Sequence, residues 1–109
     1  LPNGAIRSPD LSWVSRERWE SLTPKQKKGF IPLCPDFVVE LRSESDSLDK
    51  LQKKLLEYKE NGARLGWLID PQNRQVEIYR QGKEVEILEN PTDLSGEDVL
   101  PNFSLNLKL

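Results

Sequence analysis

The sequence predicts an α/β fold with a mixed β-sheet, on the basis of three observations. Residues 37–42 and 65–69 are short apolar runs with the composition of buried strands. Between them, apolar side chains recur at the i, i+3, i+7 spacing of one helix face. Residues 75–80 and 83–88 then alternate as a hairpin does. A right-handed strand–helix–strand crossover makes the first two strands parallel, and the hairpin adds antiparallel ones.

The N-terminal third is predicted to contain one strand and one short helix. An apolar–polar alternation indicates a strand that begins after Pro9, with Asp10 at its start. Ser15 is a favourable N-cap for a short helix over residues 16–22, because its side chain can accept a bond from an early backbone N–H group. Ser21 or Thr23 can cap a further turn at Pro24, and residues 25–34 are expected to form a connecting loop.

The central helix is predicted over residues 47–61. Asn61-Gly62 ends it, since these residue types adopt the left-handed conformation that closes a helix. At 100° per residue, Lys54 lies on the shoulder of the apolar stripe rather than on the opposite face. Among the charged residues of this helix, Lys54 is therefore well placed to reach back toward the preceding strand.

The C-terminal part is predicted to be a β-hairpin followed by a loop. Gln81-Gly82 forms a two-residue turn between the two alternating stretches. An acidic loop follows Asn90-Pro91, and a short apolar alternation from Phe103 to Leu107 ends the chain.

Composition limits the chemistry. The chain has no histidine and one cysteine, which excludes Ser-His-Asp and Cys-His catalysis and makes a zinc site of the usual ligand spacing untenable. A metal would therefore need oxygen ligands, which suit Mg²⁺ or Mn²⁺. No apolar run approaches the ~18 residues of a membrane helix, so we expect no membrane partner. With no internal disulfide available, a cytoplasmic location is expected.

Length and charge point to one small domain with a basic beginning. We expect residues 1–109 to form a single domain, and the opening Leu-Pro-Asn-Gly, without methionine, leads us to expect that its N-terminal portion is missing. Basic side chains outnumber acidic ones up to Ile31, and acidic ones dominate from Glu84 onward. The basic residues of this segment can bind phosphate groups. A solvated loop with ordinary surface lysines explains the excess of basic residues equally well.

Glu40 is the residue on which a functional hypothesis depends, because it is a carboxylate inside an apolar strand. Arg42 follows two residues later, on the same face of an extended strand. An unpaired buried charge is costly, so Glu40 requires a cation, either a side chain or a metal ion. For a metal, Asp10 is a better second ligand than Asp36, whose Cα lies about 13 Å from that of Glu40 along an extended strand. Asp36 is expected to mark the start of the strand or support its edge.

Two interpretations of this set remain open from the residues alone. Magnesium-dependent phosphodiester cleavage needs carboxylates for the ion and a cation for the attacking water or the developing phosphate charge, and Asp10, Glu40 and Lys54 supply both. Arg42 can stabilise charge but cannot accept a proton. The alternative is a structural salt bridge of Glu40 with Arg42 or Lys54, with no metal.

Taken together, these motifs resemble the PD-(D/E)XK, or restriction-endonuclease-like, superfamily. More narrowly, they resemble the bacterial "putative restriction endonuclease" family, long classed as a domain of unknown function. The resemblance is carried by Arg7-Ser-Pro-Asp10, Pro35-Asp-Phe-Val-Val-Glu40, Ser43-Glu-Ser-Asp46, Lys54-Leu-Leu-Glu-Tyr58, Gly62, Gly66-Trp-Leu-Ile-Asp-Pro71 and Val76-Glu-Ile-Tyr-Arg80.

The resemblance implies a restriction-endonuclease-like mixed sheet with a central βαβ unit and a C-terminal hairpin. Asp10 and Glu40 match the two acidic metal ligands, and Lys54 matches a helix lysine that replaces the usual lysine two residues after the glutamate. Arg42 stands at that usual position, where it would support the phosphate. Catalysis therefore depends on Lys54.

The function expected from the resemblance is hydrolysis of phosphodiester bonds by a DNA endonuclease that uses one or two Mg²⁺ or Mn²⁺ ions. DNA is then the expected partner. The resemblance leaves open whether the protein forms a homodimer. The alternative, from another class, is a nuclease-like fold retained as a non-catalytic binding or assembly module. It predicts an ion pair at Glu40 that excludes metal.

Overall fold

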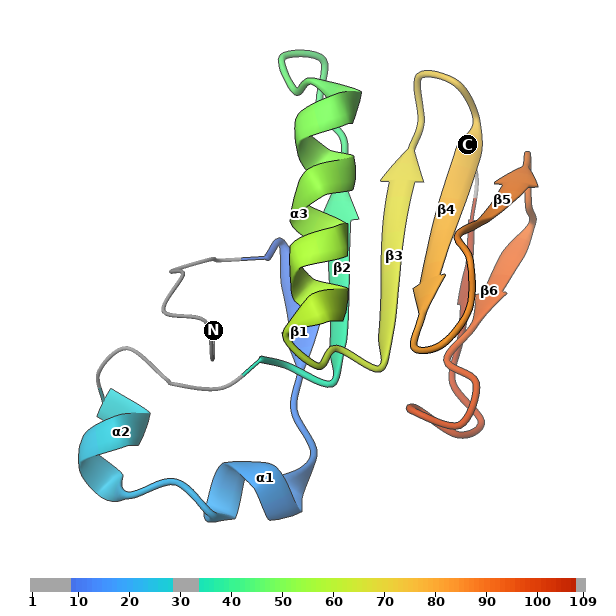
Figure 1. Cartoon of the computed structure of the whole chain (residues 1–109). Coiled ribbons are helices and arrows are strands. Elements are labelled where there is room, and N and C mark those ends of the chain that lie inside the picture. Colours follow the sequence, from blue (N-terminus) through green and yellow to red (C-terminus); the bar gives the residue numbers. More distant parts are fainter. Residues whose placement is uncertain (1–8, 29–33, 108–109) are drawn as a thin grey trace.

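The computed structural model describes residues 9–28 and 34–107. Its main feature is a five-stranded mixed sheet with a long helix packed against one face (Figure 1). In spatial order the strands are β1 (Leu11–Trp13), β2 (Phe37–Leu41), β3 (Leu65–Asp70), β4 (Gln75–Arg80) and β5 (Glu86–Glu89). The remaining elements of the described ranges are α1 (Arg16–Glu20), α2 (Pro24–Lys28), α3 (Leu48–Glu60), and the paired strands β6 (Asp93–Ser95) and β7 (Ser104–Asn106).

The predicted βαβ unit is confirmed. β2 and β3 are parallel neighbours, and α3 connects them across one face of the sheet (Figure 1). The other neighbouring pairs of the main sheet are antiparallel, so the sheet is mixed, as predicted. All six residues of β3 are buried, because this strand is covered on both faces.

The two faces of the sheet carry separate apolar clusters, as strand alternation requires. On one face, side chains of β2, β3 and β4 pack against the apolar stripe of α3; this cluster contains Cys34, Val38, Leu51, Leu55, Tyr58, Ala63, Leu68 and Tyr79. On the other face, Leu94 of β6 packs over a cluster that includes Trp67. A Cβ atom at Gly66 would lie 2.8 Å from Leu55 Cδ1, so glycine at this position lets α3 approach β3 closely.

The sequence prediction was wrong in two segments. Residues 25–28 belong to α2 rather than to a loop, while residues 29–33 lie outside the described ranges. Thr23 and Gln26 start α2 with a capping box: the Gln26 N–H group donates to Thr23 Oγ1, and the Thr23 N–H group to Gln26 Oε1. The acidic segment after Pro91 contains β6, whose single buried apolar residue, Leu94, gives too weak an alternation to predict a strand.

The hairpin of β4 and β5 is confirmed, but its turn is longer than predicted. β5 begins at Glu86, which pairs with Ile78, and this register centres the turn on Gly82. Gly82 has φ +72°, a conformation that glycine adopts without steric cost. A strict Gln81-Gly82 loop would shift the register by one residue and move Leu88, which packs against the core, to the other face of the sheet.

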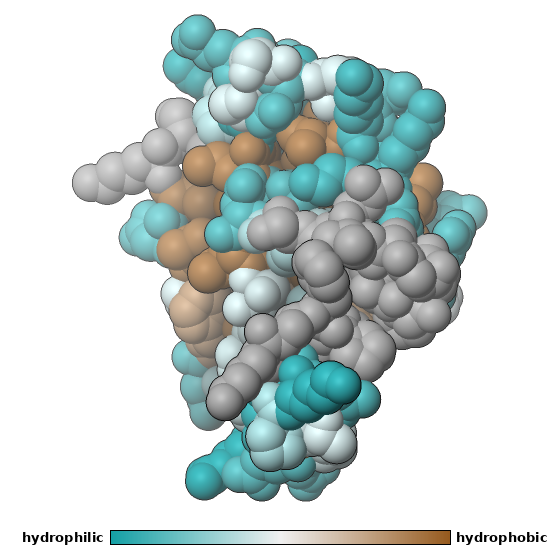
Figure 2. Space-filling model, turned by 90° about the vertical axis from the view of Figure 1, so that its left-hand side faces the viewer, coloured by the Kyte–Doolittle hydropathy of each residue, from teal (hydrophilic) through white to brown (hydrophobic). Residues whose placement is uncertain are grey.

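β1 forms one edge of the sheet, and all three of its residues are exposed. Leu11, Trp13 and the neighbouring Leu41 of β2 are exposed apolar side chains. The side of the molecule that carries β1 shows apolar surface next to polar surface (Figure 2). Within residues 9–28 and 34–107, no helix is long and apolar enough to cross a membrane.

Candidate functional site

Glu40 lies near the carboxyl end of β2, on the face that packs against α3. It is 1% exposed. Lys54 Nζ lies 2.9 Å from Glu40 Oε1, and the hydroxyl of Tyr58 donates a hydrogen bond to the same oxygen at 3.2 Å. Lys54 and Tyr58 are four residues apart on α3 and so occupy one side of the helix. The structure therefore brings Lys54 to Glu40, as the helix geometry suggested.

Both donors converge on one oxygen of Glu40. Its other oxygen, Oε2, receives no hydrogen bond from the part of the chain that the structure describes. Burial is the main cause that raises the pKa of Glu40; the Lys54 hydrogen bond and charge lower it, and the charge of Asp10 raises it again. The carboxylate is thus held in place by Lys54 and Tyr58, while burial makes a further positive charge favourable at Oε2.

Asp10 stands beside Glu40 because of how β1 pairs with β2. Leu11 pairs with Val39, so the antiparallel register places Asp10, one residue before Leu11, opposite Glu40. Asp10 Oδ2 accepts a hydrogen bond from the backbone N–H group of Leu41 at 2.7 Å. Asp10 is exposed, and its Oδ1 receives no hydrogen bond from residues 9–28 or 34–107.

The donor set fits a magnesium or manganese ion. Each carboxylate has one oxygen in an internal hydrogen bond and one open oxygen, Asp10 Oδ1 and Glu40 Oε2. Mg²⁺ typically binds proteins through one or two carboxylates and completes its shell with water and substrate phosphate. The described ranges contain no group of three or more potential metal-ligating side chains, so a site here would rely on these two carboxylates.

Arg42 is not brought to Glu40. The backbone N–H group of Arg42 still bonds to the Ile69 carbonyl oxygen at 2.9 Å, one step beyond β2, but the side chain of Arg42 has other partners. Arg42 Nη1 instead lies 3.0 Å from Asp70 Oδ2, and Arg42 Nε donates to the Asp46 carbonyl oxygen. Burial raises the pKa of Asp70, but hydrogen bonds from Asn73 and Arg42 outweigh it, and the pKa lies below its usual value.

Asp36 supports the start of β2, as expected, and does not reach Glu40. Its carboxylate is buried and accepts hydrogen bonds from the Ser15 N–H group at 2.8 Å and from Arg18 Nη1 at 2.6 Å. The second guanidinium nitrogen of Arg18 donates to the Cys34 carbonyl oxygen. Asp36 therefore ties the beginning of α1, and with it the chain that follows β1, to the central strand.

Two polar contributors were not predicted from the sequence. The sequence pattern predicts Tyr58 only as part of the apolar stripe of α3, although its spacing of four from Lys54 indicates a shared target. Glu77 of β4 is a second buried carboxylate on the α3 face, and it accepts hydrogen bonds from Gln52 Nε2 at 2.9 Å and the Tyr79 hydroxyl at 2.8 Å. Burial and Glu77 together raise the pKa of Tyr79.

Replacing Tyr58 by phenylalanine is expected to lower the free energy of unfolding by about 1–2 kcal/mol, because a buried hydrogen bond to a carboxylate is lost. Urea unfolding measures the loss. Tyr79→Phe is the matched control, since it removes an equivalent bond to Glu77. Only Tyr58→Phe should also weaken Mg²⁺ binding. An unfolding free energy equal to that of the parent would show that the Tyr58 hydroxyl contributes nothing.

Comparison with known proteins identifies a family for the chain. A solved structure described as a putative nuclease belonging to DUF820 from Anabaena variabilis ATCC 29413 is 35% identical and has a TM-score of 0.51, with 55% of this chain covered. This chain spans about a third of that protein, 34% of its length. No curated protein matches the chain. The family model described as "Uma2: Putative restriction endonuclease" matches residues 1–108. Because that match takes in almost the whole sequence, the chain belongs to the putative restriction endonuclease family.

Proposed function

We propose that this protein is a Mg²⁺- or Mn²⁺-dependent endonuclease that hydrolyses phosphodiester bonds in DNA. The observation that carries the proposal is the pair of open carboxylate oxygens, Asp10 Oδ1 and Glu40 Oε2, on neighbouring strands beside the ammonium group of Lys54. Membership of a family described as "Putative restriction endonuclease" supports nuclease chemistry with DNA as substrate.

The roles of the residues follow from their positions. Asp10 and Glu40 would hold the ion, which supplies charge against the developing phosphate and lowers the pKa of a bound water. Lys54 would orient or activate the attacking water, and Tyr58, by its hydrogen bond to Glu40 Oε1, leaves Oε2 available to the ion. Arg42 would support the phosphate only after leaving Asp70, its partner in this structure.

A non-catalytic binding or assembly module is the second candidate, and one observation favours it. Lys54 already neutralises Glu40 at 2.9 Å, so a buried charge in this protein has a partner without any metal. In that case the ion pair is structural, and no metal ion binds at Glu40 Oε2.

Thermal unfolding with and without metal separates the two functions. A metal that binds only the native state raises the melting temperature, with about 2.7 kcal/mol of stabilisation at a hundred times its Kd. We expect MgCl₂ or MnCl₂ to raise the melting temperature of the parent and not that of Asp10→Asn, with EDTA as the reference. The same samples should nick plasmid DNA only when metal is present. Absence of both effects would reject the nuclease and leave the binding module.

A further inference from the structure

An open groove of about 330 Å³ runs along the outer side of α3, lined by Lys50, Lys53, Lys54 and Glu57. Lys54 belongs both to this groove and to the Glu40 site, because its ammonium group pairs with Glu40 Oε1. The groove and the carboxylates are therefore neighbouring parts of one surface.

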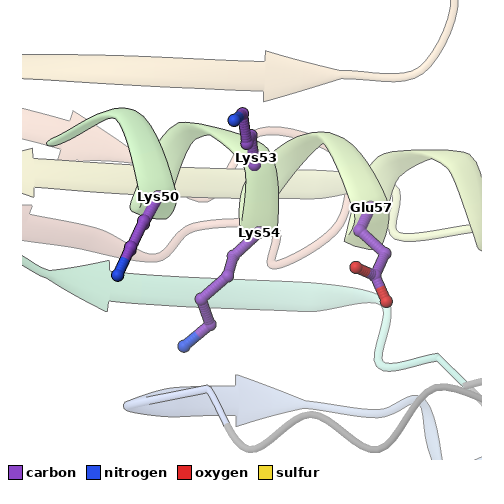
Figure 3. Close-up of a pocket in the computed structure, with 4 residues that line it drawn as sticks. All are labelled: Lys50, Lys53, Lys54 and Glu57. Atoms are coloured by element: carbon purple, nitrogen blue, oxygen red, sulfur yellow. The ribbon is translucent and has the colours of Figure 1, made fainter. Parts of the chain in front are cut away.

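The lysines of the groove differ in direction and in their partners. Lys50 and Lys54 extend toward the side of α3 on which β2 and β1 lie, whereas Lys53 points to the other side (Figure 3). Lys53 pairs with Asp49 on the helix surface at 3.3 Å. Lys50 is exposed, and no described residue forms an ion pair with it. Lys50 thus presents an uncompensated positive charge on the side of the helix that faces the carboxylates.

The spacing of Lys50 and Lys54 suits a polymer of phosphates. Side chains four residues apart on a helix have Cβ atoms roughly 5–6 Å apart. One DNA strand carries a phosphate about every 3.4 Å along the duplex axis, so two ammonium groups one helical turn apart can reach phosphates close together on the same strand. A lysine ammonium is a compact point charge that binds phosphate without demanding bidentate geometry.

We propose that Lys50 is a phosphate-contact residue that, with Lys54, aligns a DNA strand along the N-terminal half of α3. The strand's scissile phosphate lies at Asp10 and Glu40, and Lys50 binds a phosphate on the side of the β2–α3 connection. The inference rests on the proposed function, which it deepens by assigning the path of the substrate backbone. Lys50 acts on binding and has no part in the bond-breaking step.

The test is the salt dependence of DNA binding, measured without metal so that no cleavage occurs. Fluorescence anisotropy with a labelled duplex gives the association constant of the parent, Lys50→Gln and Lys83→Gln over a range of NaCl concentrations in EDTA. Loss of one phosphate contact should lower the slope of log K against log salt by about 1 and weaken binding to different sequences equally. Lys83 is also an exposed lysine, at the turn between β4 and β5, and its replacement should change neither quantity.

A Lys50→Gln slope equal to that of the parent, or equal losses for Lys50→Gln and Lys83→Gln, would overturn the inference. Failure of the proposed function would give a different combination of cleavage and binding results. If the parent never cleaves DNA with metal but Lys50→Gln still loses one unit of slope, the phosphate contact stands and the nuclease assignment falls. If the parent cleaves and the slope is unchanged, the nuclease stands and Lys50 has no contact.

Discussion

Replacing Glu40 by glutamine is expected to lower the rate of metal-dependent plasmid cleavage by at least about a hundredfold, while the sheet stays folded. Glutamine has the size of glutamate and can still accept the hydrogen bond of Tyr58, but its side chain carries no charge to hold a divalent ion. Glu40→Ala should also abolish cleavage, although it leaves a cavity and two donors without an acceptor. Agarose-gel assays with Mg²⁺ and Mn²⁺ measure the rate, and circular dichroism checks the fold.

The chain provides a matched control for this substitution. Glu77 is also a buried carboxylate on the α3 face, and Leu68 is the cross-strand neighbour of both glutamates. Glu77→Gln therefore makes the same chemical change in a similar environment, two strands from Glu40 and far from Asp10. We expect it to retain cleavage within a few-fold. Full activity of Glu40→Gln would remove Glu40 from the site.

Replacing Lys54 by glutamine is expected to lower the cleavage rate by about 10²- to 10⁴-fold, the usual contribution of a positioned proton-transfer group. The acid side of the pH–rate profile should also move to higher pH. Lys54 lowers the pKa of Glu40 against the raising effect of burial, so its loss raises that pKa further. Because only the carboxylate form holds the ion, a higher pH is then needed to reach half of the maximum rate.

Lys54→Arg separates charge from proton transfer. Arginine keeps the positive charge beside Glu40 but stays protonated, so the pH profile should return toward that of the parent while the rate stays low. Lys53→Gln is the control for removing a lysine from α3, since Lys53 pairs with Asp49 at the surface. A Lys54→Gln profile that keeps the parent's acid side would show that Lys54 does not act on Glu40.

The central βαβ unit was predictable because its signals are local and strong. The helix face around Leu55 and the apolar strands on either side each fix their own conformation, and chirality then sets the crossover. Helix geometry alone also predicted that Lys54 reaches back toward the strand that carries Glu40. The position of Asp10 opposite Glu40 was harder to predict from the sequence. It depends on the register of β1 on β2, which pairs residues about 30 positions apart in the chain.

The features that the sequence did not predict depend on contacts between residues that are far apart in the chain. Strand alternation predicts Arg42 beside Glu40, but Arg42 pairs with Asp70 at the end of β3 and donates to the Asp46 carbonyl oxygen. β6 pairs with β7 and buries one leucine, Leu94, against the far face of the sheet. Such positions are set by tertiary contacts, which residue spacing does not encode.

Because Asp10 adjoins a three-residue edge strand, the candidate site can be lost while the rest of the domain stays folded. β1 is exposed along its whole length, and β2 is its neighbour in the sheet, so it can detach at a smaller free-energy cost than the buried strands. Detachment carries Asp10 away and leaves Glu40 in an otherwise intact domain. On heating, metal-dependent cleavage should therefore be lost in a local and reversible transition, at a temperature below that of the cooperative unfolding of the core. The amide hydrogens of β1 should also exchange with solvent faster than those of β3.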